Sequence, residues 1–411
     1  MFSASETNRL YWIYGERLPF SISIRGVTRE ALNPWSKATQ KEERRMKTDT
    51  KNNEKVQALL QEKAGRIYIG VDFHKLTCTL CITDFFGLEK DTVTVDTDKL
   101  VAFLESYKGS EIAIETTGGS NHMVSVLVAN GHNATLVNTN KTKAIGLGGQ
   151  KNDDKDAEVL SDLLRTEYLP KVHLKSLLSR EVKTILVQRE MLVQTRVSLM
   201  CHVRGILREF GITIEAGPKN FYKFAPKAVS DISNEVIKKS LEENVEEIQK
   251  LKSREVAIEK SLRVFCETNH PEFFKKVERL ETVPGIGSTT AMLMVAVMDD
   301  VERFDDAQKW GSYLGLTPRE FSSGEMKKMG SITRSGCEML RRYLIHGARA
   351  VMKTVQFKKE KTMIDNWALN KKKKIGMNKA TVALAHKLAR VGFAILRDDE
   401  DFKSVQFKKS A

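Results

Sequence analysis

The chain has 411 residues, enough for two or three domains with a substantial core. Lysine and arginine total 67 against 53 aspartates and glutamates, a net charge of +14. Such an excess favours a polyanionic partner, nucleic acid before a membrane, although charge of this kind also serves solubility alone. No apolar run approaches the roughly 20 residues that cross a bilayer, and the first thirty residues do not read as a signal peptide. We therefore expect a cytoplasmic protein.

Shifts in residue pattern divide the chain into five predicted segments. Residues 1–62 lack sustained periodicity and are expected to be a flexible arm, or a non-native extension from an upstream start codon, since Met46 precedes the organised part. A nuclease-like domain is predicted over 63–175, a helical linker and dimerisation region over 176–275, a mainly helical domain over 276–400, and a basic tail over 401–411. The fold class is thus α/β plus all-α.

Short apolar runs and helical periods alternate along the first folded domain. Strands are predicted at 67–72, 76–83, 91–96, 111–115 and 134–138, with helices between the later ones. Three strands followed by alternating helices and strands is the order of a RuvC-like or RNase H-like fold.

Four acidic residues mark a candidate metal site in this domain. Asp72 and Glu115 each end an apolar strand, while Asp153 and Asp156 lie three apart at the start of a helical stretch and share one face. Carboxylates gathered within about 6 Å would repel by roughly 3 kcal/mol per pair at an effective dielectric of about 20. Cations must offset this repulsion, and carboxylate oxygens favour Mg²⁺ or Mn²⁺. The quartet therefore predicts a two-metal phosphodiester site.

Two long helices are predicted in the middle of the chain. One, from residue 179 to 210, carries Arg189, Arg196, Arg204 and Arg208 beside an apolar face. The other, from about 233 to 265, has apolar residues at 3–4 spacing, which favours a coiled coil and hence dimerisation. An ordinary amphipathic helix packed on its own domain is the open alternative.

The last domain combines a glycine turn with a basic, hydroxyl-rich loop. Gly285 and Gly287 resemble the hairpin of a helix-hairpin-helix element, where backbone N–H groups beside a helix N-terminus seat a phosphate. Ser322-Ser-Gly324 is predicted to lie in a loop between two helical stretches, within a stretch rich in cationic side chains: Arg319, Lys327, Lys328, Arg334, Arg341 and Arg342. A serine hydroxyl is a weak nucleophile until a base, a metal or cations activate it, so the loop is either a phosphate contact or a nucleophile site.

Taken in order, these motifs resemble the DEDD transposases of the insertion-sequence "one-ten" family, particularly its "eleven-eleven" branch. The resemblance covers roughly residues 65–397. It rests on the following stretches: Gly70-Val-Asp-Phe-His-Lys75, Glu115-Thr-Thr-Gly118, Lys151-Asn-Asp-Asp-Lys-Asp-Ala157, Val283-Pro-Gly-Ile-Gly287, Gly315-Leu-Thr-Pro-Arg319, Ser322-Ser-Gly324, Gly330-Ser-Ile-Thr-Arg-Ser-Gly336, Leu340-Arg-Arg-Tyr-Leu-Ile-His-Gly-Ala-Arg349, and the helix from Asn378 to Arg390.

The resemblance implies a recombinase that cleaves and rejoins donor and target DNA under the guidance of a non-coding bridge RNA. It implies that Asp72, Glu115, Asp153 and Asp156 bind Mg²⁺ or Mn²⁺ and that Ser323, or else Ser322, forms a phosphoserine with DNA. It also implies a homodimer or homotetramer in which the two domains meet across subunits. From charge alone, the guide RNA is expected on basic surface near Lys141, Lys143 and Lys151 and on the arginine face of the 179–210 helix, and an ordinary solvated face is the open alternative.

Two other functions remain open on the residues alone. A RuvC-like Holliday-junction endonuclease would use the same quartet with water as the nucleophile. A non-catalytic nucleic-acid-binding protein would use the metal only to stabilise its fold.

Overall fold

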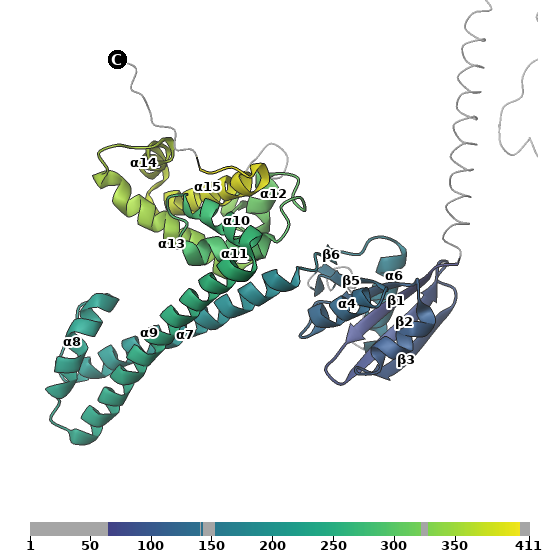
Figure 1. The fold of residues 1–411 in the computed structure, drawn as a ribbon, viewed down its shortest axis with the longest axis horizontal. Helices are drawn as coiled ribbons and strands as arrows, with labels where there is room; N and C mark the ends of the chain where they lie inside the picture. Colours follow the sequence, from purple (N-terminus) through teal and green to yellow (C-terminus); the bar gives the residue numbers. More distant parts are fainter. Residues whose placement is uncertain (1–64, 140, 143–152, 322–327, 403–411) are drawn as a thin grey trace, which may run out of the picture. The chain divides into compact units, whose positions relative to one another are not determined.

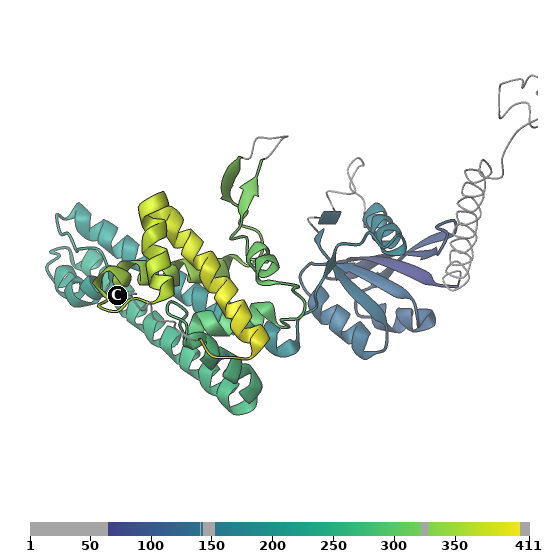
Figure 2. The same ribbon diagram turned by 90° about the horizontal axis from the view of Figure 1, so that it is seen from above.

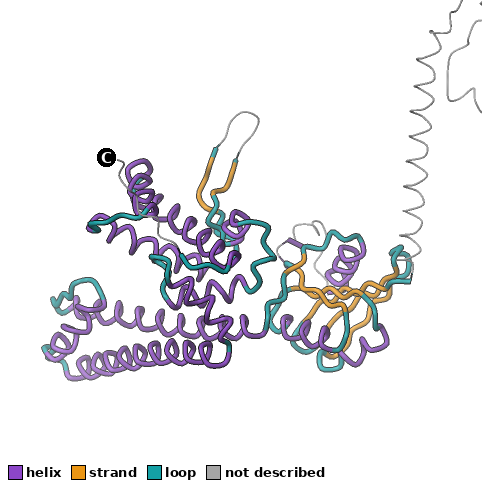
Figure 3. Tube along the Cα trace, turned by 45° about the horizontal axis from the view of Figure 1, so that its top comes forward, coloured by secondary structure: helices purple, strands orange, loops and turns teal. Residues whose placement is uncertain are grey.

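The computed structural model describes residues 65–139, 141–142, 153–321 and 328–402. The chain divides into two compact units at residues 174 and 175. The first unit is a sheet with helices on both faces, and the second is built almost wholly from helices (Figures 1 and 3).

The first unit is a six-stranded mixed sheet in the order β3-β2-β1-β4-β5-β6. Three strands form an antiparallel meander, and β4 and β5 then add in parallel beside β1. The strands are β1 (Ile67–Phe73), β2 (Thr77–Asp84), β3 (Lys90–Asp96), β4 (Glu111–Glu115), β5 (Asn133–Val137) and the short β6 (Lys171–Val172). The five predicted strands are therefore present, each within one residue of its expected ends.

Helices cover the two faces of this sheet, and alternating side chains supply a core to each. One face packs on α3 (Leu100–Leu104) and α4 (Ser120–Ala129), with the 3₁₀ turn η2 (Glu105–Tyr107) following α3. Ile69, Val71 and Ile112 lie in that core. The other face packs on α6 (Asp153–Arg165) through Tyr68 and Ala113. This mixed α/β topology is consistent with a DEDD nuclease-like domain.

The second unit begins with a long helical hairpin. Its arms are α7 (Leu177–Glu209) and α9 (Glu235–Asn269), which pack along one another, and α8 (Pro218–Ser230) lies at their far end (Figure 1). Glu255 of α9, which the sequence pattern treats as an interruption of the apolar stripe, is buried against two arginines of α7. Its carboxylate lies 2.9 Å from Arg196 and 3.4 Å from Arg189. Burial alone would raise the pKa of Glu255, but Lys252 and Arg196 hold it below its ordinary value.

This hairpin bears on two expectations for the middle of the chain. The apolar stripe of α9 is covered by α7 and α8 of the same chain, with Leu241, Ile248 and Leu251 buried. The stripe therefore needs no second subunit to bury it. Two of the four arginines predicted on one face of α7, Arg189 and Arg196, are held in ion pairs with glutamates of α9, whereas Arg208 is exposed.

The rest of the second unit is a helical core around α11 (Ser288–Met298), in which all eight residues from Ala291 to Met298 are buried. The helices α10 (Pro271–Glu281), α12 (Ala307–Tyr313), α13 (Glu338–Thr354), α14 (Met363–Ile375) and α15 (Met377–Asp398) and the turn η3 (Val355–Phe357) complete it. None of the helices in the described ranges is long and apolar enough to traverse a lipid bilayer.

A two-stranded ribbon extends from this core (Figures 2 and 3). It consists of β7 (Pro318–Glu320) and β8 (Met329–Ile332), paired antiparallel. Residues 322–327 connect the two strands and lie outside the described part of the chain. The stretch that holds Ser322-Ser323-Gly324 does lie between two helices, α12 and α13, as predicted. The ribbon itself was not predicted, because strands of three and four residues are too short to show periodicity.

Candidate functional site

The register of the sheet brings Asp72 and Glu115 side by side. Strands β1 and β4 run parallel with Val71 opposite Ile114, so the next residue on each strand is one of the two acids. Neighbouring strands lie about 4.8 Å apart, and residues two apart share a face. Asp72 lies on the same face of its strand as Tyr68, and Glu115 on the same face as Ala113, because each pair is an even number of residues apart. Tyr68 and Ala113 both pack on the α6 side of the sheet. Both carboxylates therefore face α6.

Gly70 allows α6 to cross β1 at very close range. A β-carbon at Gly70 would lie 2.1 Å from the carbonyl oxygen of Ala157 and 2.5 Å from the amide nitrogen of Ser161. No side chain fits in that space. Because Asp72 follows two residues later on the same face, the N-terminal turn of α6, with Asp153 and Asp156, comes to lie over it.

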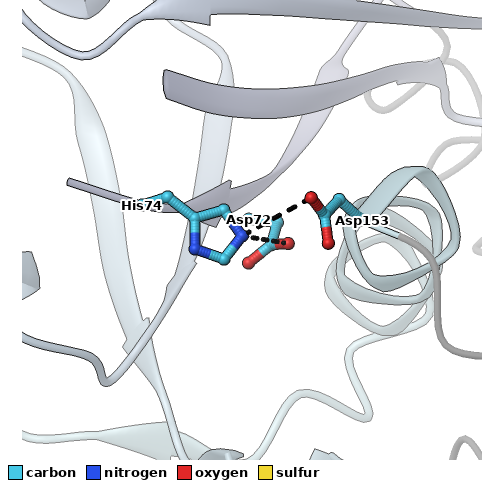
Figure 4. A group of neighbouring side chains, drawn as sticks. All are labelled: Asp72, His74 and Asp153. Atoms are coloured by element: carbon cyan, nitrogen blue, oxygen red, sulfur yellow. Dashed lines mark hydrogen bonds and ion pairs between the residues drawn. The ribbon is translucent and has the colours of Figure 1, made fainter. Parts of the chain in front are cut away.

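Asp72 and Asp153 share one cluster with a histidine (Figure 4). The Nε2 atom of His74 lies 3.1 Å from Oδ2 of Asp72 and 3.7 Å from Oδ2 of Asp153. The ligand atoms of the three side chains all lie within 4.8 Å of one another. Asp72 is buried at 8% exposure, while Asp153 and His74 are open to solvent.

The other two predicted acids lie beside this cluster. Asp156 is close enough for its charge to raise the pKa of Asp72. The Oε1 atom of Glu115 accepts a hydrogen bond of 2.5 Å from the Thr142 hydroxyl. Asp154, between the two acids of α6, is exposed.

The electrostatics of the cluster fit a bound cation. Burial raises the pKa of Asp72, and the charges of Asp153 and Asp156 raise it further, while His74 lowers it. A buried carboxylate beside two others is costly unless a cation neutralises the group. Carboxylate oxygens suit Mg²⁺ or Mn²⁺, and an imidazole is a usual ligand of divalent transition metals, so these residues fit a divalent metal site.

His74 is the member of this cluster that the sequence reading did not identify. A usable signal was present, because His74 directly follows β1 and lies two residues after Asp72, and extended backbone returns a side chain to the same face every second residue. An imidazole at that position can bind the same metal ion as the aspartate.

In the second unit, several predicted nucleic-acid contacts lie on or beside the ribbon. Arg319, Lys328 and Arg334 are exposed, and Phe321 and Met329 of the same ribbon are also open to solvent. Arg341 is buried instead, with Nη1 donating to the carbonyls of Leu314 and Ser335. These bonds brace the base of the ribbon. Arg342 forms an ion pair of 2.6 Å with Glu190 on α7.

Gly285 and Gly287 lie at the N-terminus of α11, beside a hollow of about 470 Å³. The hollow is also lined by Arg189, Thr290 and His346. A β-carbon at Gly347 of α13 would lie 1.9 Å from the carbonyl oxygen of Gly285, so the turn and α13 are in direct backbone contact. The glycines thus hold an open helix N-terminus next to basic side chains, although the helix-hairpin-helix assignment itself remains a prediction.

Of the remaining predicted residues, the structure describes only Lys141, which is exposed in a helical turn after β5. Ser322, Ser323, Lys143, Lys151 and Lys327 lie outside the described residues.

Comparison with known proteins agrees with this reading of both units. Residues 69–212 match the DEDD transposase family of the IS110 type, and residues 277–363 match the family described as "Transposase IS116/IS110/IS902 family". The chain is 29% identical to the transposase for insertion sequence element IS1111A of Coxiella burnetii, over 82% of this chain and 91% of that protein. It is 28% identical to a probable family 20 transposase of Pseudomonas aeruginosa, over 69% and 83%, and 26% identical to a putative transposase, y4pF/y4sB, of Sinorhizobium fredii, over 75% and 78%.

A sheet that gathers carboxylates beneath an acidic helix is the nuclease-like half of a DEDD transposase. With both family matches in the same order along the chain, this protein belongs to the IS110/IS116 family of insertion-sequence transposases. Membership implies an enzyme that binds DNA and cleaves and rejoins it, and the acidic cluster agrees with the divalent metal use that the family suggests.

Replacing Gly70 tests the close approach of α6. Gly70→Ala should push α6 away from β1, lower the free energy of unfolding by about 1–3 kcal/mol and abolish metal-dependent cleavage. Gly65→Ala is the control, because nothing lies within 4 Å of a β-carbon there, and its stability should change by about 0.5 kcal/mol or less. Chemical unfolding and DNA cleavage assays measure both effects. A Gly70→Ala protein with unchanged stability and activity would contradict this packing.

Replacing Asp72 tests the metal site without relying on activity alone. Mg²⁺ or Mn²⁺ at ten times its dissociation constant should stabilise the wild type by about 1.4 kcal/mol, measured by thermal melting. Asp72→Asn should lose this gain and all metal-dependent cleavage. In EDTA the variant should be at least as stable as the wild type, because it removes a buried charge whose pKa is raised. Asp154→Asn, the same change on the exposed side of α6, should keep both responses; a metal response retained by Asp72→Asn would refute the site.

Proposed function

We propose that this chain is the recombinase of an insertion sequence, which exchanges DNA strands through a metal site in its first unit and a serine in its second. The observation that carries the proposal is the convergence of Asp72 and Asp153, from a strand and a helix far apart in the sequence, on one cluster with His74. Glu115 beside Asp72 and Asp156 one turn further along α6 complete the acidic quartet.

In this proposal Asp72, Glu115, Asp153 and Asp156 hold the metal, with Mg²⁺ as the physiological ion and Mn²⁺ as a substitute. Bound there, a pair of divalent ions would polarise a DNA phosphate and neutralise charge on its oxygens. Burial of Asp72 keeps its carboxylate in place, while exposure of Asp153 and His74 leaves the opposite side of the cluster open to a substrate. The Thr142 hydroxyl orients Glu115 through its hydrogen bond.

The proposed nucleophile is Ser323, in the loop between β7 and β8. Its Oγ attacks the phosphorus of a DNA phosphodiester as its proton leaves; a P–Oγ bond forms, and the bond from phosphorus to a deoxyribose oxygen breaks. That oxygen takes up a proton and becomes a free DNA hydroxyl. Because one phosphodiester replaces another, a second DNA hydroxyl can later displace the serine without an external energy source. The cations of Arg319, Lys328 and Arg334 on the ribbon would stabilise charge on the phosphate oxygens.

Two further parts of the proposal concern partners. The donor and target sites would be selected by a non-coding bridge RNA, and the net charge of +14 supports a protein that binds nucleic acid extensively. Lys141, Lys143 and Lys151 are the proposed RNA contacts in the first unit, and Gly285 and Gly287 offer backbone N–H groups to a phosphate in the second. The active assembly would be a dimer or tetramer in which the metal site of one subunit acts with the serine of another.

A RuvC-like endonuclease is the second candidate function, favoured by the fact that Asp72, His74 and Asp153 all belong to the first unit. In that case the quartet activates water, and no covalent step occurs. The two candidates differ in whether protein and DNA become covalently joined.

The covalent step is tested by replacing Ser323. Ser323→Ala should abolish a protein–DNA adduct that survives denaturation, because it removes the attacking oxygen, while DNA binding stays within about twofold of the wild type. Ser322→Ala is the matched control and should keep the adduct. The readout is the mobility of labelled DNA in a denaturing gel. An adduct in Ser323→Ala that is lost in Ser322→Ala would move the nucleophile to Ser322, and cleavage with no adduct in the wild type would favour the endonuclease.

The guide is tested by sequencing RNA that co-purifies with the protein. We expect one abundant non-coding RNA from the same insertion sequence, whose binding weakens steeply with salt because it depends on phosphate contacts. Random cellular RNA with a nearly flat salt response would contradict guidance by a bridge RNA.

A further inference from the structure

A stripe of three lysines runs along the exposed face of α8. This helix lies at the far end of the α7–α9 hairpin (Figure 1). Lys219, Lys223 and Lys227 are four residues apart and all exposed. Residues at this spacing lie on one helix face and are separated by about 6 Å along the axis, at 1.5 Å per residue. We call these three residues the α8 lysine stripe.

The α8 lysine stripe carries charge that the described protein does not neutralise. Among the described residues, no carboxylate lies within 4 Å of any of the three ammonium groups; Lys238, close by on α9, does form an ion pair, with Glu235. The stripe is therefore a concentrated positive face rather than part of a surface ion-pair network. Phe224 is 45% exposed on the same helix, with the ammonium of Lys223 5.0 Å from its ring.

The opposite face of α8 is already used for packing. Phe221, Ala225 and Val229 are buried in a core shared with α7 and α9. An amphipathic helix that lies on a membrane, or docks into a protein groove, needs a free apolar face, and α8 has none to offer. A partner must therefore recognise the lysines themselves, which points to a polyanion.

Several contacts fix α8 as a rigid part of the hairpin. Arg204 of α7 donates from Nη2 to the carbonyl of Gly217 at 2.7 Å, and its guanidinium lies 5.2 Å from the centre of the Phe221 ring. Val182 of α7 belongs to the α11 core and Val203 to the α8 core. The two residues are 21 positions apart, which corresponds to about 32 Å of helix, so α8 is held roughly one turn of duplex DNA away from the core around α11.

From this geometry we infer that the α8 lysine stripe binds the phosphate backbone of duplex DNA, as a contact separate from the reacting site. The inference rests on the proposed DNA recombinase function. Evenly spaced cations on a rigid arm suit the regular backbone of a stiff duplex, whose persistence length is about 50 nm. Backbone contacts of this kind position DNA without reading its sequence. The stripe would therefore hold flanking DNA whatever the target sequence.

The test is the salt dependence of DNA binding by the full-length chain, measured in EDTA so that no cleavage occurs. The variant Lys219→Gln, Lys223→Gln, Lys227→Gln should bind a 30-base-pair duplex at least about tenfold more weakly at moderate salt. The slope of log K against log salt concentration should fall by about 2 to 3, because each lost phosphate contact removes about 0.9. The matched control is Lys239→Gln, Lys250→Gln, Lys260→Gln on the exposed surface of α9, which removes the same charge and should keep the wild-type slope to within about 0.5.

A second variant separates loss of charge from loss of fold. Replacing the same three residues by arginine keeps the charge and should retain the wild-type slope. Equal slopes for the glutamine variant and the α9 control would overturn the inference, as would a loss seen only with an RNA hairpin and not with duplex DNA. Because this readout needs neither metal nor Ser323, it can succeed or fail independently of the proposed chemistry. If the protein forms the covalent adduct but the α8 lysine stripe contributes nothing to DNA binding, only this inference is refuted.

Discussion

The candidate metal site depends on one close approach between a helix and a strand. The backbone of α6 passes so near Gly70 that any β-carbon would collide with the carbonyl of Ala157. That contact determines the height of α6 above the sheet, and hence the distance from Asp153 to Asp72. The approach also explains why the cluster has an electrostatic cost without metal: it holds the Asp153 and Asp156 carboxylates near a buried one. In the metal-free protein, favourable packing in the core therefore has to offset the repulsion between these carboxylates.

In the second unit, charge pairs buried in the helical hairpin have a comparable role. Arg196 and Glu255 form a buried ion pair between α7 and α9, and Arg189 pairs with the same glutamate. Removing one partner of such a pair costs about 3–5 kcal/mol, whereas replacing both by apolar residues is often neutral. The pair therefore contributes to the register of the two helices more than to net stability. Register matters here because it sets where α8 and its lysines lie.

The basic residues of the chain divide into those that hold the fold and those that remain available. Arg196 and Arg341 are buried and donate hydrogen bonds to neighbouring groups of the protein. Lys219, Arg319 and Lys328 are exposed. Composition cannot separate these groups, because a guanidinium in an ion pair and one awaiting a phosphate are the same residue type. The arginine face predicted from helical spacing therefore contains both kinds: Arg189 and Arg196 are in ion pairs, and Arg208 is exposed.

The sequence by itself determined the strand order of the first unit and three of the residues now grouped around Asp72, because periodicity and strand-end acids are local signals. It also indicated the family, through motifs that stand in one order along the chain. Only the tertiary structure decided that His74 joins the acids, that α7 rather than a second subunit covers the stripe of α9, and that the serine loop is flanked by strands. The physical reason is the same in each case: contacts between residues distant in the chain decide which side chains are buried, and burial decides which charges are left to act.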